Sequence, residues 1–441
     1  MIDPGRGRAK PVLHSVVVLL LVLIGALAVS TDGAGRVLSR SHKHHSHKRR
    51  HHHRKHTHHH ARHHRRGGAR AGAGLPAHPQ VLGTSPVLFN RETMWFASAL
   101  PVQADASRYR VMVLQAGQGS MIPVLKRYNP KLEIFMYQYS MYASPSDPTG
   151  LTRCTTLSQD LPHPNWFLKT ASGANLMNGS DYALDPGNPA YQQACMSHAL
   201  GLASRLGFDG VFFDGVGAKI GYNFGGNPNL TIPAYPTVAS WQTAMYSFLS
   251  YAGATLHAGG RKVIANIGGA VWTPGLWQKW NGPLDGAEEE SWTDGGSGAA
   301  QQLPWWTQKL ANAAWSESNG KILVLHSYNT TQAGNAYGLA SMMLIAGGSS
   351  SYSTANANIV NYEAWYPEYG VAAFLGAPLG SYRRLPNGVY ERRFASGVVL
   401  VNPSGNSVAP FSPGGGPYSG SGLSGVRSVS MGPTSGLILV G

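Results

Sequence analysis

A carboxylate at the end of a short apolar run is the first candidate for chemistry in this chain. Val211–Phe213 is typical of a buried strand, and Asp214 follows it directly, before Gly215. In a parallel α/β protein, the C-terminal ends of the strands present catalytic groups to a cleft. The alternative role for Asp214 is to cap the following helix or turn.

A second cluster of acids repeats this pattern. Leu284–Trp292 again contains an apolar residue followed by Asp-Gly, and then the acids Glu288, Glu289 and Glu290. Side chains alternate along a strand, so Glu288 and Glu290 share one face and Glu289 takes the other. We expect Glu290 to face the cleft, with Glu289 as the second choice; a charged loop on the solvated rim is the alternative interpretation.

Two carboxylates on separate strand ends can hydrolyse a glycosidic bond. One attacks the anomeric carbon or activates water, and the other protonates the leaving oxygen. Sugar substrates also need flat apolar surfaces and hydrogen-bonding groups. The candidates for substrate binding are Tyr137, Gln138, Trp166, Asn266, Trp292 and His326.

Two other acids have simpler expected roles. Asp185 precedes a proline and a predicted helix, which favours N-capping over the alternative of a place close to the site. Asp209 lies at the start of its strand, at the opposite end from Asp214, which favours a structural role. The sequence has no His-Glu-x-x-His, no Cys-x-x-Cys and no serine-triad signature, so we expect no metal and no cofactor.

The elements that would position these residues alternate between strands and helices. Helical apolar spacing is found in 189–206, 238–257, 301–317 and 333–345. Eight strand candidates that alternate with helices over about 270 residues predict an α/β fold, a (β/α)8 TIM barrel. The alternative, a doubly wound open sheet, would have a Gly-rich phosphate loop after its first strand. The strand candidates are Met94–Ala97, Val111–Leu114, Ile134–Gln138, Val211–Phe213, Val263–Ala265, Gly286–Glu288, Ile322–Leu325 and Ser350–Tyr352.

A small antiparallel β-domain is predicted after the barrel. Val389–Phe394, Gly397–Val401 and Gly436–Val440 are typical of strands separated by turn residues. The predicted boundaries are 85–378 for the barrel and 379–441 for the C-terminal β-domain.

The first thirty residues predict export. Arg6, Arg8 and Lys10 precede the apolar run 16–28, and Ala26–Ala28 has the small residues of a cleavage site. Residues 1–30 are therefore a signal peptide or, alternatively, an uncleaved membrane anchor. Either way we expect the chain to be secreted or extracellular, where Cys154 and Cys195 could pair or remain two free thiols.

The basic character of the chain belongs to its N-terminal part. Residues 1–70 hold fifteen Lys and Arg against two Asp, whereas the rest holds twenty against eighteen acids. This distribution disfavours nucleic acid as a partner, since the fold itself is nearly neutral. Residues 31–84 predict a disordered linker, and thirteen histidines fall in 41–66. That tract could be a solvated spacer, an adhesive for an anionic cell-envelope polymer, or an adventitious metal binder.

Several of these segments together resemble a family. They are 207–214, 166–169, 184–189, 284–290 and 393–403. The chain resembles bacterial TIM-barrel glycoside hydrolases, in the group near the endo-α-1,4-polygalactosaminidases and the melibiase-like barrels. The resemblance covers residues 85–405 and implies that Asp214 is the strand-four nucleophile and Glu290 the strand-six acid/base.

Two functions follow as hypotheses. The first is a secreted glycoside hydrolase that cleaves a polysaccharide or oligosaccharide with an Asp/Glu pair. The second is a non-catalytic carbohydrate-binding barrel, tethered to the cell envelope by its basic tail. The sequence sets neither the sugar and linkage nor the oligomeric state.

Overall fold

The computed structural model describes residues 88–89, 106, 109–224, 230–294, 300–354 and 366–441. The expected export segment, the histidine-rich tract and the strand expected at Met94–Ala97 lie outside these residues. Within the described part of the chain, no helix is both long and apolar enough to span a membrane.

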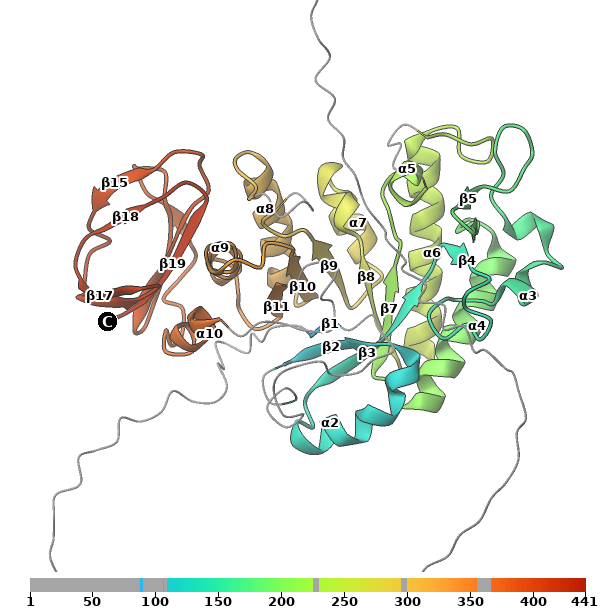
Figure 1. Ribbon diagram of the computed structural model, residues 1–441, viewed down its shortest axis with the longest axis horizontal. Coiled ribbons are helices and arrows are strands. Elements are labelled where there is room, and N and C mark those ends of the chain that lie inside the picture. The colour runs from blue at the N-terminus through green and yellow to red at the C-terminus, as the bar shows by residue number, and fades with distance from the viewer. Residues whose placement is uncertain (1–87, 90–105, 107–108, 225–229, 295–299, 355–365) are drawn as a thin grey trace, which may run out of the picture. The chain divides into compact units, whose positions relative to one another are not determined.

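Eight parallel strands form the central sheet, in the order β1-β2-β3-β7-β8-β9-β10-β11. The sheet curves into a barrel with helices on its outside (Figure 1). Seven of the eight expected strands are confirmed, and the predicted α/β barrel class with them. The strands are β1 (Leu88–Phe89), β2 (Val111–Leu114), β3 (Glu133–Tyr139), β7 (Gly210–Asp214), β8 (Lys262–Asn266), β9 (Gly286–Glu290), β10 (Ile322–Ser327) and β11 (Ser350–Thr354).

The barrel strands are apolar because both of their faces are covered. In β7, Phe212 belongs to a small cluster inside the barrel, whereas Val211 and Phe213 belong to the large core between the strands and the helices. Alternating side chains therefore divide each strand into an inward and an outward set. The inner cluster consists of Val111, Val113, Phe135, Tyr137, Phe212, Ile264, Ile322 and Val324.

Helices connect successive strands, as expected for parallel pairing. The four helices predicted from apolar spacing are confirmed; the third begins later than expected, at Trp305, after Pro304 at its N-cap. The helices after the successive strands are α2 (Ile122–Tyr128), α4 (Pro189–Leu206), α6 (Val238–Ala258), α7 (Leu276–Asn281), α8 (Trp305–Ser318), α9 (Gln332–Met343) and α10 (Pro367–Ala372).

Acids at the starts of β7 and β9 join neighbouring strands. Asp209 accepts the backbone N–H of Ile134 at 2.7 Å and pairs with Lys126 at the same distance. Asp285 accepts the N–H of Val263 at 2.7 Å in the same way. The structural role expected for Asp209 is therefore confirmed.

A long insertion separates β3 from α4. It contains the antiparallel strands β4 (Tyr142–Ala143), β5 (Met177–Asn178) and β6 (Asp181–Ala183), a sheet that the sequence pattern did not predict because these strands are only two or three residues long. Cys154 of the insertion is disulfide-bonded to Cys195 of α4, so the paired alternative holds.

The helix after the insertion differs in its cap from the expectation. Asn188, not Asp185, is the N-cap of α4, and its Oδ1 accepts the N–H groups of Ala190 and Tyr191. Asp185 instead accepts the N–H of Gly187 at 2.9 Å and the hydroxyl of Tyr235. Proline at the first helical position requires the cap one residue before it, which is why Asn188 takes this role.

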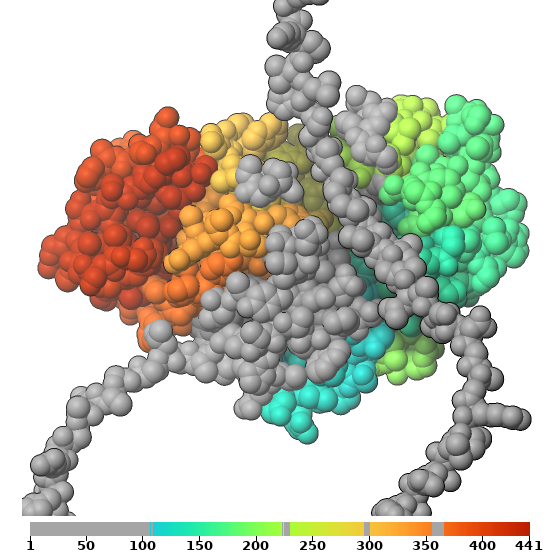
Figure 2. Space-filling view, viewed as in Figure 1, coloured from blue at the N-terminus to red at the C-terminus, as the bar shows by residue number. Residues whose placement is uncertain are grey.

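The C-terminal segment forms antiparallel sheets, as predicted. The three expected strands are confirmed to within a residue as β13, β14 and β19. Figure 2 shows the surface of this segment (red) continuous with that of the preceding residues (orange), and α9 packs against β14 and β19. The strands are β12 (Arg383–Arg384), β13 (Tyr390–Phe394), β14 (Gly397–Asn402), β15 (Val408–Phe411), β16 (Tyr418–Gly420), β17 (Leu423–Val426), β18 (Val429–Met431) and β19 (Ser435–Val440).

Candidate active site

Three polar residues end three adjacent strands of the barrel. Asp214 ends β7, Asn266 ends β8 and Glu290 ends β9. Asp214 and Asn266 stand two residues after Phe212 and Ile264, which face the barrel interior. By the alternation along a strand they face inward as well, at the C-terminal mouth where barrels place their active sites.

Asp214 is held by three donors. Its Oδ2 accepts the hydroxyl of Tyr137 at 2.6 Å, and its Oδ1 accepts the N–H of Gly215 at 2.8 Å and the Asn266 Nδ2 at 3.1 Å. Gly215 has a φ of +81°, and a Cβ there would lie 2.8 Å from the ring of Tyr139, so the turn after Asp214 requires glycine. Only 7% of Asp214 is exposed, so these hydrogen bonds replace those that its carboxylate would make with water.

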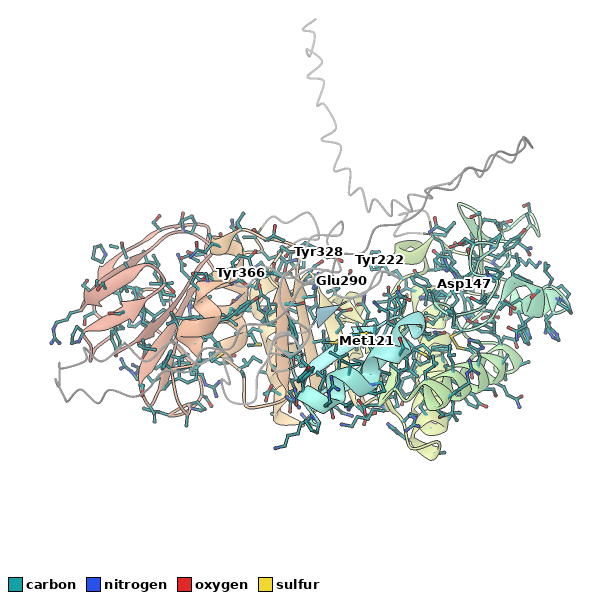
Figure 3. All side chains as sticks on the ribbon, turned by 60° about the horizontal axis from the view of Figure 1, so that its bottom comes forward. Met121, Asp147, Tyr222, Glu290, Tyr328 and Tyr366 are labelled. Atoms are coloured by element: carbon teal, nitrogen blue, oxygen red, sulfur yellow. A yellow bond between two sulfur atoms is a disulfide. The ribbon has the colours of Figure 1, made fainter. Side chains whose placement is uncertain are left out.

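Glu290 shares a donor with Asp214. The Asn266 Nδ2 donates to Glu290 Oε2 at 2.7 Å, and the hydroxyl of Tyr328 donates to Oε1. Figure 3 shows Glu290 and Tyr328 at the same end of the sheet. One amide nitrogen thus bridges the two carboxylates. The distance between the two bridged oxygens cannot exceed the sum of the two hydrogen-bond lengths, 3.1 Å and 2.7 Å.

His326 completes the inward ring on the β10 side. It pairs in register with Glu290, and its Nδ1 lies 3.0 Å from the Ser353 hydroxyl of β11. Its ring meets Tyr328 edge to face at 4.9 Å. Asp214, Glu290, Tyr137, Asn266 and His326 therefore gather at one mouth.

The structure does not bring the other four predicted site residues to this cluster. Glu289 and Gln138 lie on the outward parity of β9 and β3, where Gln138 donates to the Leu151 carbonyl at 3.1 Å. Trp292 is 1% exposed, and its indole N–H donates to the Gly338 carbonyl at 3.0 Å. Trp166 is buried in the insertion, stacked on His163 at 4.2 Å. The expectation that they contact substrate is corrected by this placement.

Glu289 has a buried partner behind the sheet. The Lys309 ammonium of α8, whose side chain is 1% exposed, lies 2.8 Å from Glu289 Oε1 and also donates to the Ser291 carbonyl. Burial raises the pKa of Glu289 from its usual 4.5 to about 7, and Lys309 opposes that shift. Ser291 directly follows Glu290 and turns the backbone, with a φ of +72°. Because Lys309 donates to the Ser291 carbonyl, it helps to hold this turn.

Lys309→Met is expected to destabilise the fold by about 3–5 kcal/mol, because it leaves Glu289 buried without its cation. Urea unfolding measures the effect. The double variant E289L/K309M removes both charges and should recover most of the loss.

The folded pKa of Glu289 lies above its unfolded value, so the contribution of Glu289 to the free energy of unfolding falls as the pH rises from 4.5 to about 7. The wild type should lose stability relative to the double variant over that range. A Lys309→Met protein as stable as the wild type would contradict this role.

Tyr328 and Ser353 were not predicted as site residues. Tyr328 lies two residues after His326, just beyond β10, and so has the inward parity of that strand. Its position after a strand end, which singled out Asn266 and His326, was the signal available in the sequence.

The barrel presents an aspartate and a glutamate at the C-terminal ends of its fourth and sixth strands, β7 and β9. The chain belongs to hypothetical glycosyl hydrolase family 15, whose sequence model matches residues 126–398. It is therefore a carbohydrate-cleaving hydrolase by class.

No curated protein matches the chain. Among solved structures it is similar to a β-L-arabinopyranosidase from Geobacillus stearothermophilus, at 11% identity over 83% of this chain and 99% of that chain, with a TM-score of 0.45. It is also similar to an α-amylase from Geobacillus thermoleovorans, at 7% identity over 81% of this chain and 98% of that chain, with a TM-score of 0.42.

Proposed function

We propose that this protein hydrolyses a glycosidic bond with retention of configuration, with Asp214 as the nucleophile and Glu290 as the acid/base. The bridge through the Asn266 Nδ2 carries the proposal. It keeps one oxygen of each carboxylate within two hydrogen-bond lengths, 3.1 Å and 2.7 Å, of the other, and so supports the close pairing of carboxyl groups, roughly 5–5.5 Å apart, that retaining enzymes use. A close pair suits direct attack by one carboxylate on the anomeric carbon, rather than attack by a water held between carboxylate and sugar.

The contacts favour this division of roles. Asp214 accepts three hydrogen bonds, which stabilise the negative charge that a nucleophile needs. Glu290 is less buried than Asp214, as suits the residue that meets the leaving group and the incoming water. In the first step Asp214 forms a bond to the anomeric carbon while Glu290 gives its proton to the leaving oxygen. In the second step Glu290 takes a proton from water, which displaces Asp214.

Tyr137 and Asn266 are positioning residues in this proposal. Tyr137 orients Oδ2 of Asp214, and Asn266 sets the spacing of the two carboxylates. The Tyr137 hydroxyl and the Asn266 amide both donate to Asp214, whose negative charge is lost when it bonds to the sugar and restored when water displaces it.

The test is the anomeric configuration of the first product. The full chain is incubated with soluble starch, galactomannan, glycol chitin and aryl glycosides, and NMR follows any released sugar before mutarotation. Retention is expected. Inversion would contradict the proposed mechanism, and binding of a polymer without any hydrolysis would favour a carbohydrate-binding barrel.

We also propose that the protein acts outside the cytoplasm, with the basic segment 31–84 adhering to an anionic envelope polymer. The apolar run in residues 1–30 and the disulfide Cys154–Cys195 support export. Mass spectrometry of the mature N-terminus in medium and envelope fractions tests this. A full-length chain retained in the cytoplasm would contradict it.

A further inference from the structure

Three aromatic side chains stand on consecutive loops at the barrel mouth. Tyr222 lies on α5 (Ile220–Asn223), after β7; Trp272 ends η3 (Gly268–Trp272), after β8; Trp305 begins α8, after β9. We call these three residues the aromatic rim. Tyr222 is 42% exposed and Trp305 53% exposed, and Trp272 is half-buried.

The rim is one connected structure. At one end of η3, Gly269 lies against Tyr222, such that a Cβ on it would be 3.5 Å from the ring. At the other end, Trp272 meets Trp305 edge to face, with ring centroids 5.0 Å apart. The Gln308 Nε2 donates to the Val271 carbonyl at 2.5 Å and so ties α8 to η3.

The rim is also tied to the residues that carry the proposed chemistry. The loop that holds Trp272 starts directly after Asn266, and a Cβ on Gly268 would lie 3.5 Å from Asn266 Oδ1. On the other side, the Lys309 ammonium lies 5.4 Å from the Trp272 ring centroid, and it also contacts Glu289 of β9 and the Ser291 carbonyl directly after that strand. Figure 3 shows Tyr222 at the same edge as Glu290.

These contacts give the rim the properties of a binding surface. A large aromatic ring exposed to water gains free energy when a flat apolar face covers it. The C–H face of a pyranose ring supplies such a face. A ring already fixed by its neighbours loses little conformational entropy when it binds. Trp305 is exposed and held against Trp272, and so fits this description best.

We propose that the aromatic rim binds sugar units of a chain beyond the bond that is cleaved. The substrate is then a polysaccharide or long oligosaccharide, which lies across the loops after β7, β8 and β9. The inference rests on the proposed glycosidase function and deepens it, since Asp214 and Glu290 alone would serve a disaccharide equally well.

The experiment compares Trp305→Ala with the wild type on substrates of two lengths. The probes are soluble starch, galactomannan and glycol chitin as polymers, and the aryl glycosides of the same sugars as short substrates. We expect kcat/KM of Trp305→Ala to fall about tenfold more on the cleaved polymer than on the matching aryl glycoside, as loss of one stacked ring predicts. Trp305→Phe should recover part of that loss.

The control is Tyr251→Ala, which removes a ring that is 37% exposed on the outer helix α6 and should change neither value. Binding is measured separately, by the retardation of the Asp214→Asn chain in native gels that contain each polymer, with and without Trp305→Ala.

The outcomes separate the two proposals. Equal losses on long and short substrates, or an unchanged polymer affinity, overturn the rim inference and leave the carboxylate pair intact. A wild type that neither cleaves nor binds any of these polymers or glycosides overturns both.

Discussion

Asp214→Asn is expected to lower kcat at least a thousandfold, which corresponds to about 4 kcal/mol of lost transition-state stabilisation. An amide of the same size can still accept the hydroxyl of Tyr137 but cannot attack the anomeric carbon. The measurement is the rate of reducing-end release from the substrate that the wild type cleaves. The smaller variant Asp214→Gly should regain activity with added azide and yield a glycosyl azide of inverted configuration.

The matched control is Asp209→Asn, on the same strand segment but at the opposite end of the barrel. Asp209 binds Lys126 and the Ile134 N–H, so its loss should lower the melting temperature and leave kcat at the wild-type value. Full activity in Asp214→Asn, with melting and circular dichroism unchanged, would remove Asp214 from the mechanism.

Glu290→Gln is expected to slow the cleavage of natural glycosidic bonds by about 10²–10⁴-fold, the range of general acid catalysis. Glutamine cannot protonate the leaving oxygen. Aryl glycosides with an acidic phenol need no such proton, so their bond cleavage should fall far less. The measurement is kcat/KM across a series of aryl leaving groups, whose dependence on leaving-group acidity should become steep.

Glu289→Gln is the control for this prediction. It changes the neighbouring acid, which faces away from the mouth, and should alter stability through Lys309 while the leaving-group dependence stays as in the wild type. If Glu290→Gln were equally slow on all leaving groups, Glu290 would not be the acid.

The alternation of side chains allowed much of this site to be predicted. The apolar runs gave the strands, and parity separated Glu290 from Glu289. The same rule would have excluded Gln138, since Tyr137 and Gln138 are adjacent on one strand and cannot both face inward. The expectation for Trp292 failed for a different reason. Ser291, at φ +72°, ends the strand conformation, so alternation does not extend from Glu290 to Trp292.

Other features depend on tertiary contacts that a linear pattern does not carry. Tyr328 reaches Glu290 from a loop of the next strand. Trp166 in the insertion and Trp292 after β9 are buried, whereas Trp305 at the start of α8 is largely exposed. Which of several tryptophans meets solvent is decided by how helices and loops pack, and no local spacing reports it.

The contact of the C-terminal sheets with the barrel bears on how the chain could be shortened. Phe394, Val399, Val401 and Ile438 belong to the same large core as the barrel residues. The Arg392 guanidinium of β13 donates to the carbonyls of Met343 and Ala346 at the end of α9, at 3.0 Å and 2.7 Å.

A chain cut near residue 378 would therefore expose apolar α9 surface and leave carbonyl groups of the barrel without their donor. The barrel and the C-terminal strands are separate sheets, but we expect them to unfold together as one cooperative unit. Heating the intact chain should melt barrel and β-domain in one transition, and the catalytic barrel is best studied with its C-terminal strands attached.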